Sequence, residues 1–256
     1  MITSTSNERI KHITQLVKSA KARRKEGIFV VEGERIAREI PKDRMVECFV
    51  SDDFDKRGSI KNLLGYETEV TVVSSDVFIK MSDTKSPQGI LCVCRNERTG
   101  ADDFIKAHGS GSLKILILEG IQDPGNLGTM IRTAEGAGFD AVIADTDTVD
   151  VYNPKVTRST MGSVFRVPVI YTDDLLSVID MLKGEGITVY AAHLKAEHSF
   201  RDEVYPDRVA FLIGNEGNGL SDAAAERADR LIGIPMKGKL ESLNAAVAAA
   251  ILMYNV

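Results

Sequence analysis

Residues 209–222 read VAFLIGNEGNGLSD, a stretch that decides how the second half of the chain is interpreted. Its first five residues form an apolar run that is typical of a strand buried in a parallel sheet. The run ends at a loop with three glycines in six positions, and glycine lets a backbone approach a ligand closely. A plain surface turn would not require the polar pair Asn215–Glu216 directly after an apolar strand. Since open α/β sheets bind their ligands in loops at strand ends, the pattern predicts a binding site.

Two further loops of this kind lie on either side of it in the sequence. Residues 119–143, EGIQDPGNLGTMIRTAEGAGFDAVI, pass from a strand end through a Pro-Gly turn into a helix that carries Arg132 about two turns in. Asn126 is suited to cap that helix, and the glycine spacing does not match the G-x-G-x-x-G of dinucleotide-binding folds. Residues 234–254, IPMKGKLESLNAAVAAAILMY, pass from a strand end to an alanine-rich helix. The expected apolar face of this helix comprises Leu243, Val247, Ala250, Ile251 and Tyr254.

Strands and helices alternate along the chain, which is typical of α/β folds. In the first half, strands are expected at 28–33, 46–50, 70–73 and 90–94, with a helix over 53–64. In the second half, strands are expected at 114–120, 141–144, 189–192, 209–214 and 231–234, and helices at 126–137, 154–161, 172–183, from Ser221 and at 241–254. The polar, Gly-Ser-containing segment between the halves is interpreted as a linker. The predicted organisation is a small α/β domain over 1–98, a linker over 99–112, and an α/β domain with a mostly parallel sheet over 113–256.

The composition is that of an ordinary globular protein. The 256 residues are 43% hydrophobic and 27% charged with a formal net charge of −5, which excludes a disordered chain. No apolar run approaches the ~18 residues of a membrane span, and the first residues do not resemble a signal peptide. Cys48, Cys92 and Cys94 form no C-x-x-C pair, and His193 and His198 lack a third ligand nearby, so no metal site is expected. We expect a cytoplasmic protein with reduced thiols and with neither a membrane nor a metal partner.

Basic residues are concentrated at the start of the chain. Residues 1–26 carry a net charge of +5, whereas the rest of the chain carries −10. Thr5 and Glu8 match a capping box, an amphipathic helix follows, and Gly27 is suited to end it. One helix face would pack while the cations stay exposed to a polyanion such as RNA, although a merely solvated helix face would carry the same charges. The candidate RNA-binding residues are Arg9, Lys11, Lys18, Lys21, Arg23, Arg24 and Lys25.

The three loops, taken together and in this order, resemble the motifs of the SpoU/TrmH-type branch of the SPOUT RNA methyltransferases. The matching segments are NLGTMIRTA with Asn126 and Arg132, IGNEGNGLS with Glu216, and IPM followed by ESLNAAVAAAI with Ser242 and Asn244. The first half is similar to the ribosomal-protein-like, RNA-binding substrate domain of that family, through NERIK near the start, FVVEG, and SPQGI at 86–90. The resemblance covers nearly the whole chain. Ala245–Ala246 departs from it, where relatives often carry Val-Ser.

The resemblance implies a deep trefoil knot in the C-terminal domain, S-adenosylmethionine (AdoMet) as cofactor, and a homodimer whose site is completed across subunits. The implied catalytic set is Asn126, Arg132, Glu216, Ser242 and Asn244. The implied cofactor-binding set is Gly214, Asn215, Gly217, Ile234, Met236 and Leu243. Since a guanidinium is effectively always protonated, Arg132 has two open roles: an unusually deprotonated base, or a cation that stabilises the developing alkoxide. Glu216 would then orient Arg132 or accept the proton through water.

The implied reaction moves a methyl group from AdoMet to a ribose 2′-oxygen of structured RNA, and the RNA itself is open. An N-terminal domain of this kind is typical of the ribosomal RNA members, which favours 23S rRNA over transfer RNA. A non-catalytic RNA-binding or ribosome-assembly protein would keep the fold, but it has no need of both Asn126 and Arg132. A nucleotide-binding oxidoreductase is disfavoured because the phosphate-binding glycine pattern is missing. The leading prediction is an AdoMet-dependent 23S rRNA 2′-O-methyltransferase.

Overall fold

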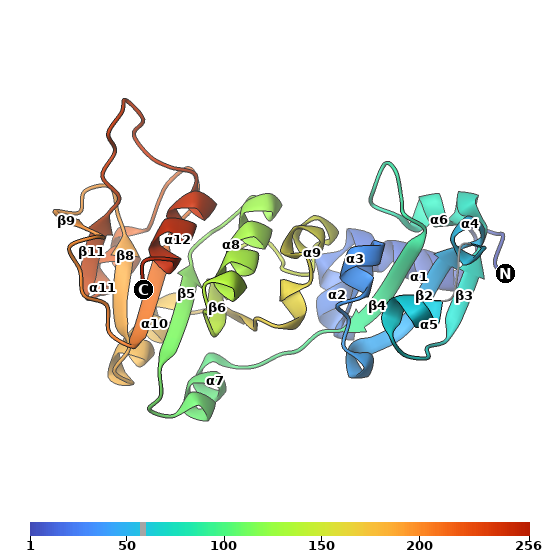
Figure 1. Cartoon of the computed structure of the whole chain (residues 1–256), viewed down its shortest axis with the longest axis horizontal. Coiled ribbons are helices and arrows are strands. Elements are labelled where there is room, and N and C mark those ends of the chain that lie inside the picture. Colours follow the sequence, from blue (N-terminus) through green and yellow to red (C-terminus); the bar gives the residue numbers. More distant parts are fainter. Residues whose placement is uncertain (57–59) are drawn as a thin grey trace. The chain divides into compact units, whose positions relative to one another are not determined.

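The computed structural model describes residues 1–56 and 60–256, which form two units (Figure 1). The N-terminal unit comprises Met1–Glu97 and Asp150–Phe165, and the C-terminal unit comprises Arg98–Val149 and Arg166–Val256. Residues 150–165 therefore pack with the first half of the chain, although the predicted boundary assigns them to the second domain. None of the described helices is long and apolar enough to cross a bilayer.

The N-terminal unit is built on a four-stranded sheet in the order β1-β4-β2-β3. The strands are β1 (Ile28–Glu32), β2 (Met45–Ser51), β3 (Val70–Val73) and β4 (Ile90–Arg95), which confirms the four predicted strands. β4 runs antiparallel to both of its neighbours, and β2 and β3 run parallel. Because alternate side chains point to opposite faces, Phe49 and Leu91 belong to one hydrophobic cluster and Cys48 and Cys92 to the other.

Short helices supply the rest of both clusters. They are α1 (Glu8–Lys18), α2 (Ala20–Glu26), α3 (Glu34–Ala37), α4 (Asp52–Asp55), α5 (Ile60–Leu64) and α6 (Ser75–Met81). The unit also contains α9 (Pro154–Thr160) and the 3-10 turns η1 (Lys42–Arg44) and η2 (Ser163–Phe165). α4 and α5 match the ends of the helix predicted over 53–64, of which residues 57–59 lie outside the described part of the chain. The three cysteines are buried thiols, as predicted.

The predicted first helix is two helices. Asn7, not Thr5, begins α1, because the Asn7 side-chain oxygen accepts a hydrogen bond from the backbone N–H of Arg9. The predicted capping box is therefore wrong. Ser19 interrupts the helix with an extended backbone and caps α2 with its own hydroxyl. Gly27 ends α2 with a φ of 69°, which confirms the predicted left-handed C-cap.

Arg23 is not a surface cation. Its side chain is 4% exposed, and its guanidinium donates to the Asp150 carboxylate at 2.9 and 2.7 Å. The same group donates to the backbone carbonyls of Leu16 and Val17 at 2.6 and 3.1 Å. A charge buried in a low-dielectric interior needs such partners. Arg23 therefore joins α1 and α2 to the segment at Asp150, and the prediction that it stays exposed to RNA is wrong.

The SPQGI segment, residues 86–90, belongs to a loop of the N-terminal unit that hydrogen bonds hold in place. The side-chain oxygen of Gln88 accepts a hydrogen bond at 2.8 Å from the backbone N–H of Glu34, at the start of α3. The buried carboxylate of Glu32 accepts from the hydroxyls of Ser82 and Thr84 at 2.7 and 2.8 Å. Both contacts fix the loop between α6 and β4 onto the end of β1.

The C-terminal unit holds a seven-stranded sheet in the order β7-β6-β5-β10-β8-β11-β9, with parallel pairing throughout. Its strands are β5 (Leu113–Leu118), β6 (Ala141–Asp145), β7 (Val169–Thr172), β8 (Thr188–Ala192), β9 (His198–Ser199), β10 (Arg208–Ile213) and β11 (Arg230–Gly233). The mostly parallel sheet is confirmed, and the edge strands β7 and β9 add to the predicted set. The trefoil knot stays a prediction.

The helices of this unit include one inside the predicted linker. They are α7 (Ala101–His108), α8 (Pro124–Gly136), α10 (Leu175–Gly184), α11 (Asp222–Arg227) and α12 (Ala245–Met253). Phe104 and Ile105 of α7 are buried in the same hydrophobic cluster as residues of β5. Residues 99–112 are therefore not a plain linker, because two adjacent apolar side chains dock this polar segment onto the C-terminal unit.

The buried face of α12 is not the predicted one. The buried residues are Ala246, Ala249, Leu252 and Met253. On the predicted face, Val247 is 48% and Tyr254 is 66% exposed. α12 packs against α8 and β10, and small alanine side chains allow a close approach. Ala246 and Ala249 therefore face inward at the start of the helix, and Val247 is left on the outer face.

Replacing Arg23 with alanine is expected to lower the free energy of unfolding by about 3–5 kcal/mol, because the Asp150 carboxylate is left without its partner. Chemical denaturation followed by circular dichroism measures the change. Lys25→Ala, at an exposed neighbour on α2, is the matched control and is expected to shift stability by less than about 0.5 kcal/mol. Equal stability of the two variants would show that the ion pair does not hold this unit.

Candidate active site

The three motif loops meet at one edge of the C-terminal sheet. Because its strands run parallel, the carboxyl ends of β5, β8, β10 and β11 lie at the same edge. The loops that follow these strands begin at Glu119, His193, Gly214 and Ile234. Open parallel sheets bind their ligands at this edge, so the position agrees with the prediction from strand-end loops.

Asn215 shapes the glycine-rich loop after β10. Its side-chain amide donates to the carbonyl of Gly120 at 2.6 Å, and its side-chain oxygen accepts from two backbone N–H groups within the loop at 2.9 and 3.0 Å. Position 214 requires glycine, because a Cβ on Gly214 would lie 2.3 Å from the backbone nitrogen of Leu220. The loop is therefore held by its own backbone, and it presents the Glu216 side chain toward the loop after β5.

Glu216 joins the second motif to the first. Its carboxylate accepts hydrogen bonds from the backbone N–H groups of Gln122 and Asp123, both at 3.1 Å, and from the side-chain amide of Asn126 at 2.9 Å. Partial burial acts to raise the pKa of Glu216, but these donors outweigh the burial and hold the pKa below its ordinary value. The carboxylate is therefore ionised at neutral pH, with its oxygens occupied by the first motif.

Asn126 joins the first motif to the third. Its side-chain oxygen accepts a hydrogen bond at 2.9 Å from the side-chain amide of Asn244. The side-chain oxygen of Asn244 accepts in turn from the N–H groups of Ala246 and Val247 at 2.9 and 3.3 Å, which makes Asn244 the N-cap of α12. One row of hydrogen bonds thus runs from Glu216 through Asn126 and Asn244 into α12.

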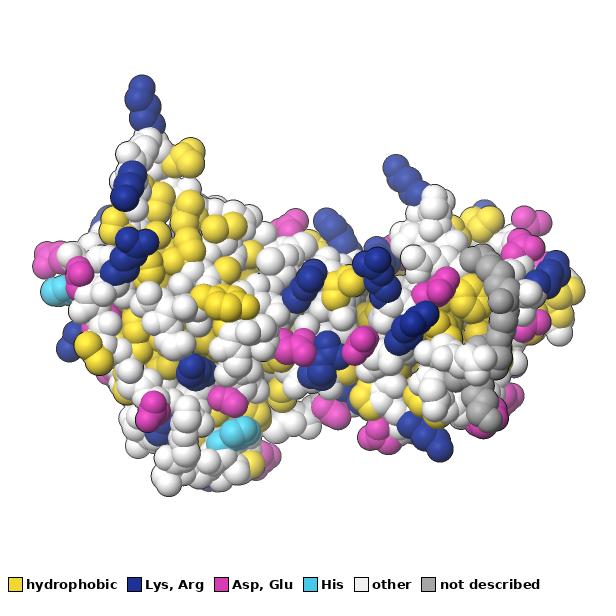
Figure 2. Space-filling view, in the orientation of Figure 1, with side chains coloured by type: hydrophobic (Ala, Val, Ile, Leu, Met, Phe, Trp, Pro, Cys, Tyr) yellow, Lys and Arg dark blue, Asp and Glu magenta, His cyan; other side chains and the backbone are white. Residues whose placement is uncertain are grey.

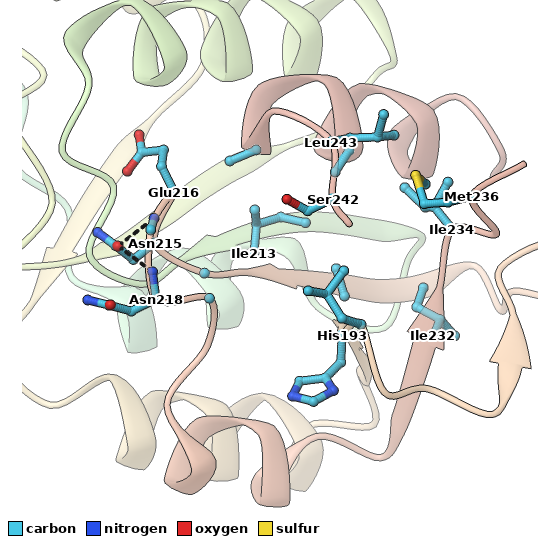
Figure 3. A pocket seen from close by; sticks show the side chains of 17 residues that line it. His193, Ile213, Asn215, Glu216, Asn218, Ile232, Ile234, Met236, Ser242 and Leu243 are labelled. Atoms are coloured by element: carbon cyan, nitrogen blue, oxygen red, sulfur yellow. Dashed lines mark hydrogen bonds between the residues drawn. The ribbon is translucent and has the colours of Figure 1, made fainter. Parts of the chain in front are cut away.

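A cavity of about 220 Å³ lies between the loops after β8, β10 and β11 (Figure 3). The six predicted cofactor-binding residues all line it: Gly214, Asn215, Gly217, Ile234, Met236 and Leu243. Ile213 and Ile232 add to its apolar walls. In the described part of the chain, no backbone–backbone hydrogen bond engages residues 234–243, so their N–H and C=O groups are available to a ligand. Apolar walls with a few polar backbone groups suit a flat, neutral ring such as adenine.

A polar recess adjoins the cavity. Glu216, Ser242 and Leu243 line both the cavity and the recess. Asn126 and Asn244 line the recess but not the cavity. The recess therefore brings together Asn126, Glu216, Ser242 and Asn244 of the predicted catalytic set. An apolar cavity beside amide, hydroxyl and carboxylate groups can hold a cofactor and a polar reactant side by side.

Arg132 is not part of the recess within one chain. It follows Asn126 by six residues on α8, which places it about 9 Å farther along the helix and on a different face. Its side chain is exposed and makes no hydrogen bond or ion pair within the described residues. The expected cap of α8 is also corrected: Asp123, not Asn126, caps the helix by accepting a hydrogen bond from the N–H of Asn126 at 2.8 Å.

One segment of the cavity wall, the start of the loop after β8, has no counterpart in the predicted set. Ala192, His193 and Leu194 line the cavity directly after β8. The rule that strand-end loops bind ligands, applied to β8 as to its neighbours, would have found them. Sequence reasoning considers His193 only as a metal ligand. Among the residues that the structure describes, no three His, Cys, Asp or Glu side chains are grouped to hold a metal ion.

The predicted RNA-binding cations lie on α1 and α2 of the N-terminal unit. Those that are exposed are Arg9, Lys11, Lys18, Lys21, Arg24 and Lys25. Arg9 pairs with Glu47, and Lys11 pairs with Glu8 one turn away. Surface pairs of this kind are weak, so the charges stay able to exchange partners. Arg23 leaves the set because it is buried.

Comparisons with known proteins agree with this geometry. The model of the SpoU rRNA Methylase family matches residues 113–254, and that of the MRM3-like substrate binding domain matches residues 7–92. The chain is 36% identical over 257 residues to the 23S rRNA (guanosine(2553)-2'-O)-methyltransferase RlmP of Bacillus subtilis, with 100% of this chain and 98% of that protein covered. The chain therefore belongs to the SpoU rRNA methylase family.

Two solved structures with bound AdoMet support the same assignment. An rRNA methyltransferase from Sinorhizobium meliloti has a TM-score of 0.83 and 27% identity, with 99% of this chain and 95% of that chain covered. The SpoU methyltransferase AviRb from Streptomyces viridochromogenes has a TM-score of 0.86 and 25% identity, with 97% and 96% covered. The predicted class of enzyme, an AdoMet-dependent RNA ribose 2′-O-methyltransferase, is confirmed.

Two substitutions of Asn244 separate its two contacts. Asn244→Ser keeps a capping oxygen for α12 but cannot reach Asn126, whereas Asn244→Ala loses both contacts. We expect the alanine variant to be less stable than the serine variant by about 1 kcal/mol, and both to lose methyl transfer to a similar extent. Thermal unfolding and a methylation assay measure the two effects. Full activity in the serine variant would mean that the Asn126–Asn244 contact is not needed.

Proposed function

We propose that this chain, as a homodimer, methylates a ribose 2′-hydroxyl of 23S rRNA, at the position equivalent to the guanosine 2553 named for its Bacillus relative. The proposal is carried by the row of hydrogen bonds from Glu216 to Asn244, which joins three motifs beside a cavity of suitable chemistry. The similarity to that relative extends over the whole chain, including the region that matches a substrate-binding domain. An rRNA substrate agrees with the predicted cytoplasmic location.

The cavity and the recess have separate tasks. When bound, AdoMet supplies an electrophilic methyl group. The backbone of 234–243 and the apolar walls hold its adenosine part, while the hydroxyl of Ser242 and the amides of Asn126 and Asn244 align the ribose 2′-oxygen with the methyl group. Glu216 positions Asn126 rather than acting as the base, because the three hydrogen bonds that it accepts keep its pKa low and make it a weak proton acceptor.

A second copy of the chain completes the site. The outer face of α12 is apolar, with Val247 and Tyr254 exposed, and Figure 2 shows hydrophobic side chains gathered over this helix. Gly136 of α8 lies against Tyr254, since a Cβ there would be 2.8 Å from the tyrosine hydroxyl. Arg132 is one turn earlier on the same face of α8. Pairing of two such faces about a two-fold axis brings Arg132 of one subunit to the recess of the other.

Arg132 acts in that recess as a cation. An arginine guanidinium stays protonated in proteins, so it stabilises the negative charge that develops on the 2′-oxygen and holds the neighbouring phosphate. The remaining RNA contacts come from the exposed cations of α1 and α2, which bind phosphates without reading bases. Arg23 contributes only indirectly, by holding these two helices in place.

Incubation of the protein with methyl-labelled AdoMet, unmethylated 23S rRNA transcript and transfer RNA tests the reaction. We expect one 2′-O-methyl group on 23S rRNA, mapped by mass spectrometry. Arg132→Ala is expected to bind AdoMet normally and to lose about 10²-fold or more in rate, because one stabilising cation is removed. Label in transfer RNA alone would contradict the proposed 23S rRNA substrate. Label in neither RNA would favour the non-catalytic RNA-binding protein, and full activity of Arg132→Ala would exclude a catalytic role for Arg132.

The homodimer is tested at Val247. A charge on the outer face of α12 would be buried unpaired in the interface, so Val247→Glu is expected to give a monomer without methylation activity. Light scattering after size-exclusion chromatography measures the mass. Ile79→Glu is the matched control, because Ile79 is 56% exposed and lies on α6 of the N-terminal unit. A monomeric wild-type protein with full activity would contradict the proposal.

A further inference from the structure

The loop between β11 and α12, residues 234–244, carries two lysines that have no partner in the described part of the chain. Lys237 and Lys239 are exposed, and they make no ion pair or hydrogen bond there. Five other cations of the C-terminal unit are held by carboxylates: Lys106, Arg166, Lys183, Arg227 and Arg230. In a chain with a net charge of −5, two free cations on one loop are a local attraction for a polyanion.

The same loop forms a wall of the cavity. Met236, Ser242 and Leu243 line the cavity from this loop, and Figure 3 shows them on its upper side. Figure 1 shows the loop extending beyond the helices of the C-terminal unit before it returns to α12. In the described chain, no backbone–backbone hydrogen bond holds residues 234–243. A ligand in the cavity therefore has a large part in deciding the conformation of the loop.

An exposed apolar residue follows the lysines. Leu240 is 71% exposed, next to Lys239 in the sequence. A flexible ammonium group binds a phosphate as a point charge, and an apolar side chain beside it packs on the face of a sugar or a base. The loop thus has the chemistry for a nucleic acid strand that passes over the mouth of the cavity.

We propose that Lys237 and Lys239 bind backbone phosphates of the RNA beside the target ribose, and that their loop couples RNA binding to cofactor binding. The proposal rests on the proposed function, since the RNA substrate is taken from there. Cofactor in the cavity orders the loop, so the lysines are already in place when RNA arrives. The second ligand then avoids part of the ordering cost, which is positive cooperativity between two adjacent sites. By linkage, RNA raises cofactor affinity by the same factor.

The test compares wild type with the double variant Lys237→Ala/Lys239→Ala. The probe is an in vitro transcript of 23S rRNA, and S-adenosylhomocysteine fills the cavity without reacting. In wild type, we expect bound S-adenosylhomocysteine to increase the affinity for RNA by about fivefold or more, an increase called here the cofactor gain. In the double variant the gain is lost, and the slope of log affinity against log salt falls by about 2, because two phosphate contacts are missing. Affinity for S-adenosylhomocysteine without RNA is expected to be unchanged, because neither lysine lines the cavity and both substitutions keep the backbone groups of the loop.

Two control variants make the result specific. Lys237→Arg/Lys239→Arg keeps both charges and is expected to keep the salt slope and the cofactor gain. Lys106→Ala removes one lysine from α7, which precedes β5 at the opposite edge of the sheet, and is expected to behave as wild type. If the alanine double variant keeps the wild-type slope or the wild-type cofactor gain, the proposal is wrong. Methylation of the same transcript by wild type reports separately on the proposed function, so failure of one is distinguished from failure of the other.

Discussion

The arrangement of the active site depends on one ionised carboxylate. Glu216 accepts hydrogen bonds from two backbone N–H groups and one amide in residues 122–126, groups that would otherwise stay unpaired at the sheet edge. Because the same carboxylate fixes the Asn126 amide, it also determines where the Asn126 oxygen points, and that oxygen accepts the Asn244 amide. Asn244 in turn begins α12. A single charge thus sets the relative position of three segments that are far apart in the sequence.

The same chain of contacts explains why the C-terminal unit leaves apolar side chains in water. Near Asn244, the buried face of α12 carries Ala246 and Ala249, where larger side chains would push this end of the helix outward and move Asn244 away from Asn126. The bulkier Val247 and Tyr254 are left on the outer face, where a contiguous apolar surface favours association. In the proposed homodimer, the constraint that positions the Asn244 amide therefore also supplies the interface that delivers Arg132.

The parts of the structure that the sequence predicts correctly depend on local pattern. Apolar runs predict the central strands of both sheets, and the order of three motifs predicts which residues line the cavity. The prediction that Arg23 is exposed is wrong because Arg23 has the same local pattern as Arg24 and Lys25, while its partner Asp150 lies 127 residues away. The prediction of the buried face of α12 is wrong because apolar residues occur all around this helix. Only packing against α8 and β10 determines which side is buried.

The recess also limits how the proton can leave the ribose hydroxyl. Glu216 is ionised, but its pKa is lowered by the hydrogen bonds that occupy its oxygens. Ser242, Asn126 and Asn244 contribute hydroxyl and amide groups, which are not bases. A cation beside the 2′-oxygen favours its deprotonated form and makes the hydroxyl more acidic. The proton can therefore pass to water as the bond from oxygen to carbon forms, without a strong base in the recess. In the proposed reaction, the rate therefore rests on the alignment of the 2′-oxygen by three neutral side chains and on the positive charge of Arg132 beside it.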